Sequence, residues 1–207
     1  MGRLHALIAV GVWLAACDSG IFPDRTGPVP TVTQERAVAV AASDAPALDP
    51  LLSRFCDVSH GEGEGPVFVA PASVPAIEAT PPGAWTWINV WATWCVPCVR
   101  EMPGLVAELR PSPVALRFVS ADDDAAAVRA FAAGAGLSMP LPVLNSPSDQ
   151  TAALAAGAGL PGDAALPLHL LVDPAGRLRC ARVGEAALSD VRDFLGAIGA
   201  PSRRRIR

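Results

Sequence analysis

Apolar and polar positions along this 207-residue chain follow two kinds of pattern, one typical of strands and one typical of helices. Short apolar runs predict strands, most of them buried, at 67–70, 85–90, 114–120, 141–144, 168–172 and 178–183. The longer stretches between them predict helices at 99–110, 122–133, 148–156 and 187–198. Strands that alternate with helices in this way indicate an α/β domain, in which a tight turn at 173–176 pairs the last two strands antiparallel.

The folded domain is predicted to begin at Asp49. The pair Asp49–Pro50 is typical of a helix start, with Asp as the N-cap and Pro as the first helical residue. The preceding stretch is rich in Pro, Ala, Thr and Asp, and such a segment of about 30 residues spans roughly 30 Å as a flexible tether. The predicted organisation is a signal peptide at 1–16, a tether at 17–48, the domain at 49–200 and a basic disordered tail at 201–207.

The first residues have the features of a secretory signal. Arg3 supplies a positive charge, and the apolar run at 4–14 is too short to span a bilayer. The run ends in the sequence LAAC at 14–17, which resembles the bacterial lipobox. Cys17 would then carry the lipid; the alternative is an ordinary signal peptide in which Cys17 is incidental. The expected location is the extracytoplasmic, periplasmic side of a bacterial membrane, with the chain anchored by lipid.

Cys95 and Cys98 form a C-x-x-C pair between a strand-like run at 85–90 and a helix-like run at 99–110. Cys95 is therefore predicted to lie at the first turn of a helix, where backbone N–H groups and the helix dipole favour a thiolate. Cys98, one turn further on, can attack a mixed disulfide formed at Cys95. The pair predicts a dithiol/disulfide centre that needs no cofactor.

A C-x-x-C pair is also half of a structural zinc site. Such a site needs two more ligands, and the sequence has neither a second C-x-x-C nor a closely spaced pair of histidines. The other candidate ligands are far apart in sequence: Cys56, His60, His169 and Cys180. We expect no metal, and we keep a non-catalytic metal-binding module as an alternative.

The residues around the two cysteines resemble the thioredoxin superfamily, most closely its membrane-tethered TlpA/ResA-like branch with CcmG/DsbE-like relatives. The matching motifs are N-x-W-A-T-W at 89–94, W-C-x-x-C at 94–98, the kinking helix proline at Pro103, and LPLHLLVDPAG at 166–176, which looks like the cis-proline loop, a strand and a D-x-x-G hairpin. The resemblance covers roughly 65–200. It implies a thioredoxin-like fold, a central mixed β-sheet flanked by helices, here with an N-terminal extension.

The resemblance also implies roles for residues near the cysteines. Pro167, if cis, would place the backbone of Leu166 beside Cys95, where an extended substrate segment could pair with it. Trp94 would shield one side of the Cys95 sulfur and offer an apolar contact, with plain packing as the alternative. Asn89 stands where cytosolic thioredoxins carry a buried Asp. Because an amide cannot titrate, proton transfer here must use water or another carboxylate.

Cys56 and Cys180 are the two cysteines that still have no assigned role. The predicted extracytoplasmic compartment favours disulfides. A bridge between them would close a loop of over 100 residues. In the chain-entropy account such a bridge stabilises the fold by about 4–5 kcal/mol. The alternatives are two buried free thiols or a second redox relay. We predict a structural disulfide.

The net charge of −4 argues against a nucleic-acid binder. The expected function is a membrane-anchored thiol–disulfide oxidoreductase that reduces protein disulfides, in cytochrome c maturation or a similar thiol-reducing pathway. A membrane electron-donor protein would restore its dithiol. The alternative is an oxidase or isomerase, although the chain lacks the added helical domain that DsbA-like oxidases carry.

Overall fold

The computed structural model describes residues 47–70, 77 and 81–200. Its strands are β1 (Val58–Ser59), β2 (Thr86–Trp91), β3 (Ala115–Ser120), β4 (Leu168–Val172) and β5 (Leu178–Val183). Its helices are α1 (Leu48–Phe55), α2 (Val96–Leu109), α3 (Ala125–Gly134), α4 (Pro147–Gly157) and α5 (Leu188–Ala197). The predicted signal peptide with Cys17, the tether up to residue 46 and the basic tail lie outside the described residues.

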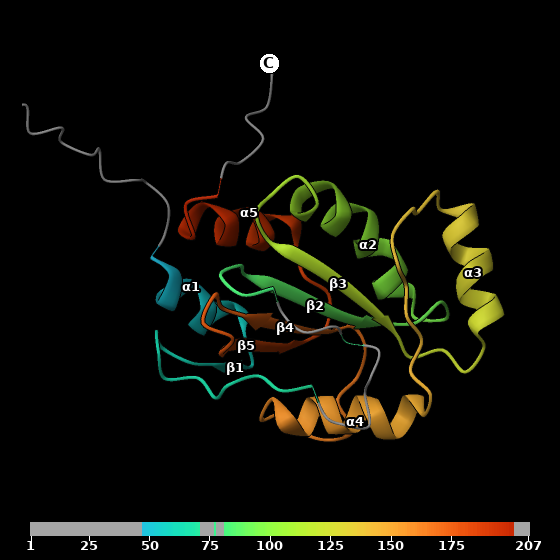
Figure 1. Cartoon of the computed structure of the whole chain (residues 1–207), viewed down its shortest axis with the longest axis horizontal. Helices are drawn as coiled ribbons and strands as arrows, with labels where there is room; N and C mark the ends of the chain where they lie inside the picture. Colours follow the sequence, from blue (N-terminus) through green and yellow to red (C-terminus); the bar gives the residue numbers. More distant parts are fainter. Residues whose placement is uncertain (1–46, 71–76, 78–80, 201–207) are drawn as a thin grey trace, which may run out of the picture. The chain divides into compact units, whose positions relative to one another are not determined.

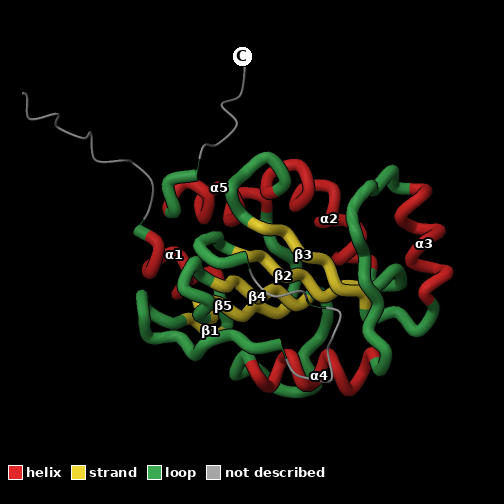
Figure 2. Tube along the Cα trace, in the orientation of Figure 1, coloured by secondary structure: helices red, strands yellow, loops and turns green. Residues whose placement is uncertain are grey.

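The strands form one mixed sheet in the order β1-β5-β4-β2-β3 (Figure 2). β2 pairs parallel with β3 and antiparallel with β4, and β5 pairs antiparallel with both β4 and β1. A parallel strand pair joined through a helix, followed by an antiparallel hairpin and a final helix, is the thioredoxin-like arrangement. The predicted fold class is confirmed.

Helices cover both faces of the sheet: α4 packs on one face, and α1, α2 and α5 pack on the other (Figure 1). Successive side chains of a strand point to opposite faces, so β2 supplies Trp87 and Trp91 to one core and Ile88 and Val90 to the other. All six residues of β2 are buried. This explains why apolar side chains of β2 face both sides of the sheet rather than only one.

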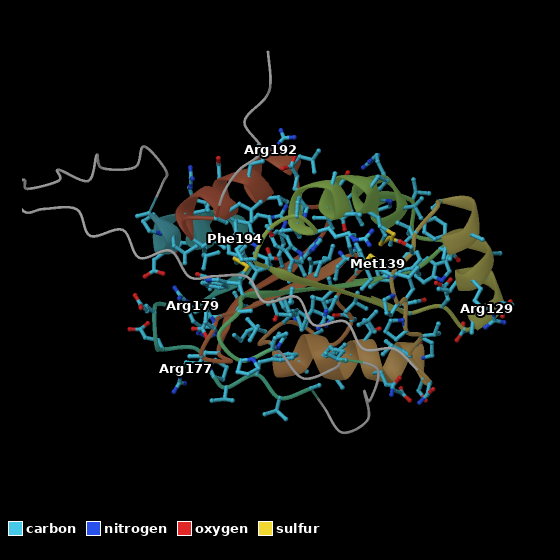
Figure 3. All side chains as sticks on the ribbon, turned by 45° about the horizontal axis from the view of Figure 1, so that its top comes forward. Arg129, Met139, Arg177, Arg179, Arg192 and Phe194 are labelled. Atoms are coloured by element: carbon cyan, nitrogen blue, oxygen red, sulfur yellow. A yellow bond between two sulfur atoms is a disulfide. The ribbon has the colours of Figure 1, made fainter. Side chains whose placement is uncertain are left out.

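Aromatic rings fix α1 and α5 to the sheet. Phe194 reaches from α5 toward the sheet (Figure 3), with its ring centroid 5.4 Å from that of Trp85 and 5.6 Å from that of Trp87. Phe55 at the end of α1 lies 6.0 Å from Trp87. Edge-on and tilted contacts of this kind add to the free energy of burial, so Trp87 ties both helices to the middle of the sheet.

Two predicted strands are wrong. Segment 67–70 makes only an isolated bridge, Val67 to Arg177, because an antiparallel ladder continued from that pair would run along the turn at 173–176 rather than along β5. Segment 141–144 makes only a bridge from Val143 to Ser120. There, prolines at 140 and 142 remove two backbone donors that a ladder would need.

Two predicted helix starts also differ from the structure. α1 begins at Leu48 with Ala47 in the N-cap position, so Asp49 is not the cap and Pro50 is not the first helical residue. The Asp49 carboxylate instead pairs with Arg179 of β5. The helix predicted from residue 122 starts at 125, and its N-cap is Asp124, which accepts a hydrogen bond from the backbone N–H of Ala126.

Candidate active site

Cys95 is the N-cap residue of α2, directly after the loop that leaves β2. Its sulfur forms a disulfide with Cys98, with the two Cα atoms 5.3 Å apart, and the backbone N–H of Cys98 points at the Cys95 sulfur over 3.3 Å. Such an N–H stabilises negative charge on a sulfur at a helix start, so the geometry favours a thiolate at Cys95 in the reduced state.

The two cysteines differ in access. Cys95 is 5% exposed and lines a surface groove, whereas Cys98 is 1% exposed and packs in the core beneath α2. A substrate can therefore approach the sulfur of Cys95 but not that of Cys98. This arrangement matches the division of labour between an attacking and a resolving thiol.

The groove beside Cys95 has a volume of about 720 Å³. Trp94, Cys95 and Val96 line one side, and residues of α4 and of the loop 162–166 line the other. Trp94 is 67% exposed and Val96 is 72% exposed, so apolar side chains flank the cysteine in solvent. Packing in the core does not account for Trp94, and its exposed ring is available for a partner.

The peptide bond between Leu166 and Pro167 is cis. Leu166 lines the same groove as Trp94 and Cys95, whereas Pro167 is buried behind it. The carbonyl of Pro167 accepts a hydrogen bond from the backbone N–H of Gly184 over 2.8 Å. The structure thus brings two of the expected substrate-side residues, Trp94 and Leu166, to the groove beside Cys95, and the third, Pro167, lies buried behind it.

Asp122 holds the loop that leads to Cys95. This carboxylate is 3% exposed and accepts hydrogen bonds from the backbone N–H of Thr93 at 2.9 Å, the Thr93 hydroxyl at 2.5 Å and the Ser120 hydroxyl at 2.7 Å. The sequence suggested a solvated helix cap at this position, and that prediction is wrong for Asp122. Its partners lie on the C-terminal end of β3 and on the loop before α2, so it couples these two segments.

Replacing Asp122 with Asn should destabilise the domain by about 2–3 kcal/mol and lower the reactivity of Cys95. The backbone N–H of Thr93 can only donate and faces both carboxylate oxygens, so an amide N–H₂ in place of either oxygen sets a donor against a donor. Thermal unfolding and the rate of Cys95 alkylation in the reduced protein measure the two effects. Asp124→Asn is the matched control, since Asn and Asp cap helices about equally well. Equal changes in both variants would contradict the role given to Asp122.

A buried polar network lies on the inner side of α2. Asn89 of β2 donates through Nδ2 to Oε1 of Glu101 over 2.9 Å, and the backbone N–H of Ala186 donates to Oε2 of Glu101 over 2.8 Å. His169 of β4 lies with Nε2 3.4 Å from the same Oε1, and its Nδ1 accepts from the indole N–H of Trp87 over 3.0 Å. Glu101 is therefore a carboxylate held in the core by residues of three segments.

Glu101 and His169 were not identified as functional residues from the sequence. Glu101 could have been found, because it lies three residues after Cys98 and residues at that spacing share one face of a helix. His169 carries no comparable signal, since its position within β4 reads as an ordinary strand residue.

A surface ion pair joins α2 to the loop that follows β5. Arg100 of α2 donates through Nε to Oε1 of Glu185 over 2.9 Å, and this hydrogen bond holds the pKa of the Glu185 carboxyl below its usual value. The loop after β5 is thus bound to α2 twice, by the exposed Arg100 and by the buried Glu101, which accepts from Ala186.

The remaining cysteines of the described region lie away from the groove. Cys56, at the C-terminal end of α1, forms a disulfide with Cys180 of β5, with Cα atoms 5.5 Å apart. Within the described ranges, no group of three or more His, Cys, Asp or Glu side chains is placed to hold a metal ion. In the same part of the chain, no helix is long and apolar enough to cross a membrane.

The Redoxin family profile matches residues 79–197, which include both active-site cysteines, α2 and the cis-proline loop. The chain belongs to the Redoxin family. Within the thioredoxin superfamily it is a TlpA/ResA-like member, as its motifs suggested. Cys56 lies before the Redoxin match and Cys180 lies within it, so the disulfide fastens the preceding helix to the Redoxin domain.

Among curated relatives, the thiol-disulfide oxidoreductase ResA of Geobacillus thermodenitrificans (strain NG80-2) is 31% identical over 120 residues, which cover 56% of this chain and 64% of that protein. The thioredoxin-like protein YneN of Bacillus subtilis (strain 168) is 39% identical over 59 residues, or 26% of this chain and 35% of that protein. The chain thus spans less than two thirds of the length of these relatives.

Solved structures similar to the Redoxin domain include StoA from Bacillus subtilis, at 17% identity and a TM-score of 0.45, covering 59% of this chain and 92% of that one. A putative thiol:disulfide interchange protein DsbE from Chlorobium tepidum has 23% identity and a TM-score of 0.43, covering 56% and 82%. The family membership rests on the sequence matches.

Proposed function

We propose that this protein is a thiol–disulfide oxidoreductase that reduces disulfides in other proteins. The observation that carries the proposal is the Cys95–Cys98 disulfide at the start of α2, with one sulfur at a groove and the other in the core. The names of relatives such as ResA support this activity. A groove flanked by exposed apolar side chains suits an extended polypeptide better than a small polar molecule.

The exchange proceeds in two substitutions at sulfur. The Cys95 thiolate attacks one sulfur of the substrate disulfide, the substrate S–S bond breaks, and the other substrate sulfur leaves as a thiolate. Cys98 then attacks the Cys95 sulfur of the mixed disulfide, and the second substrate sulfur leaves. Two electrons pass to the substrate, which ends as a dithiol, and the Cys95–Cys98 disulfide is formed.

The second substitution requires Cys98 to lose its proton inside the core. Asn89 cannot take it, whereas Glu101 is a buried carboxylate one helical turn from Cys98 on the same face of α2. We assign Glu101 as the proton acceptor for Cys98. Asn89 leaves two kinds of acceptor open, water or another carboxylate, and Glu101 is the carboxylate that we propose.

The proposed location is the extracytoplasmic side of a bacterial membrane, with lipid on Cys17. The LAAC pattern and the tether composition support this part of the proposal. A membrane protein would return electrons to the oxidised pair, and apocytochrome c or a similar cysteine-pair protein would receive them. A tether of about 30 residues would let the domain search the adjacent membrane surface.

Equilibration of the Cys95–Cys98 pair with glutathione is expected to give a midpoint potential near about −270 mV, the value of a reductant such as thioredoxin. The reduced protein should then reduce insulin disulfides with turnover when an electron donor is supplied. A midpoint near about −120 mV would instead identify an oxidant, because a strongly stabilised Cys95 thiolate favours the reduced form. Absence of any insulin reduction would reject the catalytic function.

A further inference from the structure

His169 is a fully buried histidine that the two-step exchange does not by itself require. It lies on β4, opposite Asn89 of β2 and Arg182 of β5, and its exposed fraction is 0%. Its Nε2 has no hydrogen-bond partner within the described part of the chain and lies 3.4 Å from Oε1 of Glu101. A buried polar atom aimed at a buried carboxylate calls for a functional explanation.

The hydrogen bonds determine which nitrogen of His169 carries the proton. An indole N–H can only donate, so Nδ1 must accept from Trp87 and is unprotonated. Nδ2 of Asn89 lies 3.2 Å from the same Nδ1, which is consistent with a second donor there. Nδ1 is therefore the accepting nitrogen, and Nε2 is the nitrogen on the Glu101 side of the ring.

Two charged side chains face His169 from neighbouring elements. Glu101 faces it from α2, and Arg182 is its register partner on β5, on the same face of the sheet. The Arg182 guanidinium donates to the carbonyls of Phe55 and Glu185 and remains a cation beside the ring.

We propose that His169 is a positioning residue for the resolving step, held by Trp87 so that its Nε2 edge stays against Oε1 of Glu101 and fixes where that carboxylate lies beneath α2. The proposal rests on the proposed oxidoreductase function. The Cys98 thiol gives its proton to Glu101, and the resulting thiolate attacks the Cys95 sulfur. The bond from Cys95 to the substrate sulfur then breaks, and the substrate leaves as the reduced thiolate.

The test measures the two chemical steps separately: formation of the mixed disulfide and its resolution. Mixed-disulfide formation is followed in a Cys98→Ala background with a peptide disulfide, and resolution is followed by rapid quench in chains that retain Cys98. His169→Leu is expected to slow resolution at neutral pH by about tenfold to a hundredfold, within the range of general base catalysis. It should also shift the pH profile of resolution, because the contact that fixes the proposed proton acceptor is lost.

His169→Gln, which keeps an N–H donor and does not titrate, is expected to restore resolution to within about threefold of the wild-type rate. Leu170→Ala is the matched control: it removes a core side chain of the same strand that faces α4, so it lowers stability without touching the network. Its pH profile should equal that of the wild type.

The proposal would be overturned if the His169→Leu protein resolves the mixed disulfide with the wild-type pH profile. It would also be overturned if the variant forms and resolves the mixed disulfide more slowly by the same factor. If that variant does not fold, Trp87→Phe decides, since it deletes the N–H that fixes the tautomer. A shift of its profile supports the proposal, and an unchanged profile rejects it. Failure of the Cys98→Ala chain to form any mixed disulfide would reject the oxidoreductase function itself.

Discussion

Replacing Cys95 with Ser is expected to reduce turnover of disulfide substrates by at least about a thousandfold, the scale of loss when an enzyme is deprived of its nucleophile. The structure supports this direction because Cys95 lies at the groove with an N–H directed at its sulfur, whereas Cys98 is enclosed. Insulin reduction measures the loss. If the variant unfolds like the parent protein but shows no turnover, the loss comes from the missing nucleophile and not from misfolding.

Cys98→Ser is the complementary variant. It leaves Cys95 able to attack and removes the thiol that resolves the mixed disulfide, so covalent complexes with substrate should accumulate on Cys95. Mass spectrometry after trapping identifies the cysteine that carries the substrate. Complexes that collect on Cys98 in the Cys95→Ser protein would show that the two roles are reversed.

Removing the second disulfide, by Cys56→Ala together with Cys180→Ala, is expected to cost about 4–5 kcal/mol of unfolding free energy. The bridge joins residues separated by 124 positions, and its loss lets the unfolded chain explore many more conformations. For a domain of this size the melting temperature should fall by about 10–20 °C. Thermal unfolding followed by circular dichroism gives the shift.

The same double variant separates a structural bridge from a redox relay. The pair lies outside the groove, between the end of α1 and β5, so turnover per folded molecule at low temperature should remain close to that of the parent. Loss of turnover in a protein that is still folded would give Cys56 and Cys180 a part in electron transfer. The corresponding single variants would leave one buried thiol and are less informative.

Local patterns were sufficient where neighbours in sequence make the structure. The strands predicted at 168–172 and 178–183 have those limits, and the turn between them closes as the D-x-x-G pattern indicates, with Gly176 at a φ of 77° and Asp173 accepting from the backbone N–H groups of Ala175 and Arg177. The C-x-x-C pair likewise lies at a helix start. Each of these features depends on contacts over a few residues.

Pairing between distant segments could not be obtained in this way. Strand β1, two residues long, exists because β5 offers it an edge, and the run at 141–144 lost its ladder to two prolines. An apolar run predicts that a segment is buried. The strand with which that segment pairs depends on the register of the whole sheet.

The functional site shows the same difference between local patterns and contacts of distant segments. The sequence by itself predicted Cys95 and Cys98 at a helix start and left water or another carboxylate as the proton acceptor for Cys98. Only the tertiary structure supplied that carboxylate, because Glu101 acquires its role by meeting Asn89 from β2 and His169 from β4, residues separated from each other by 80 positions. Buried polar groups must find partners wherever the fold brings them, and a linear pattern does not record which ones it brings.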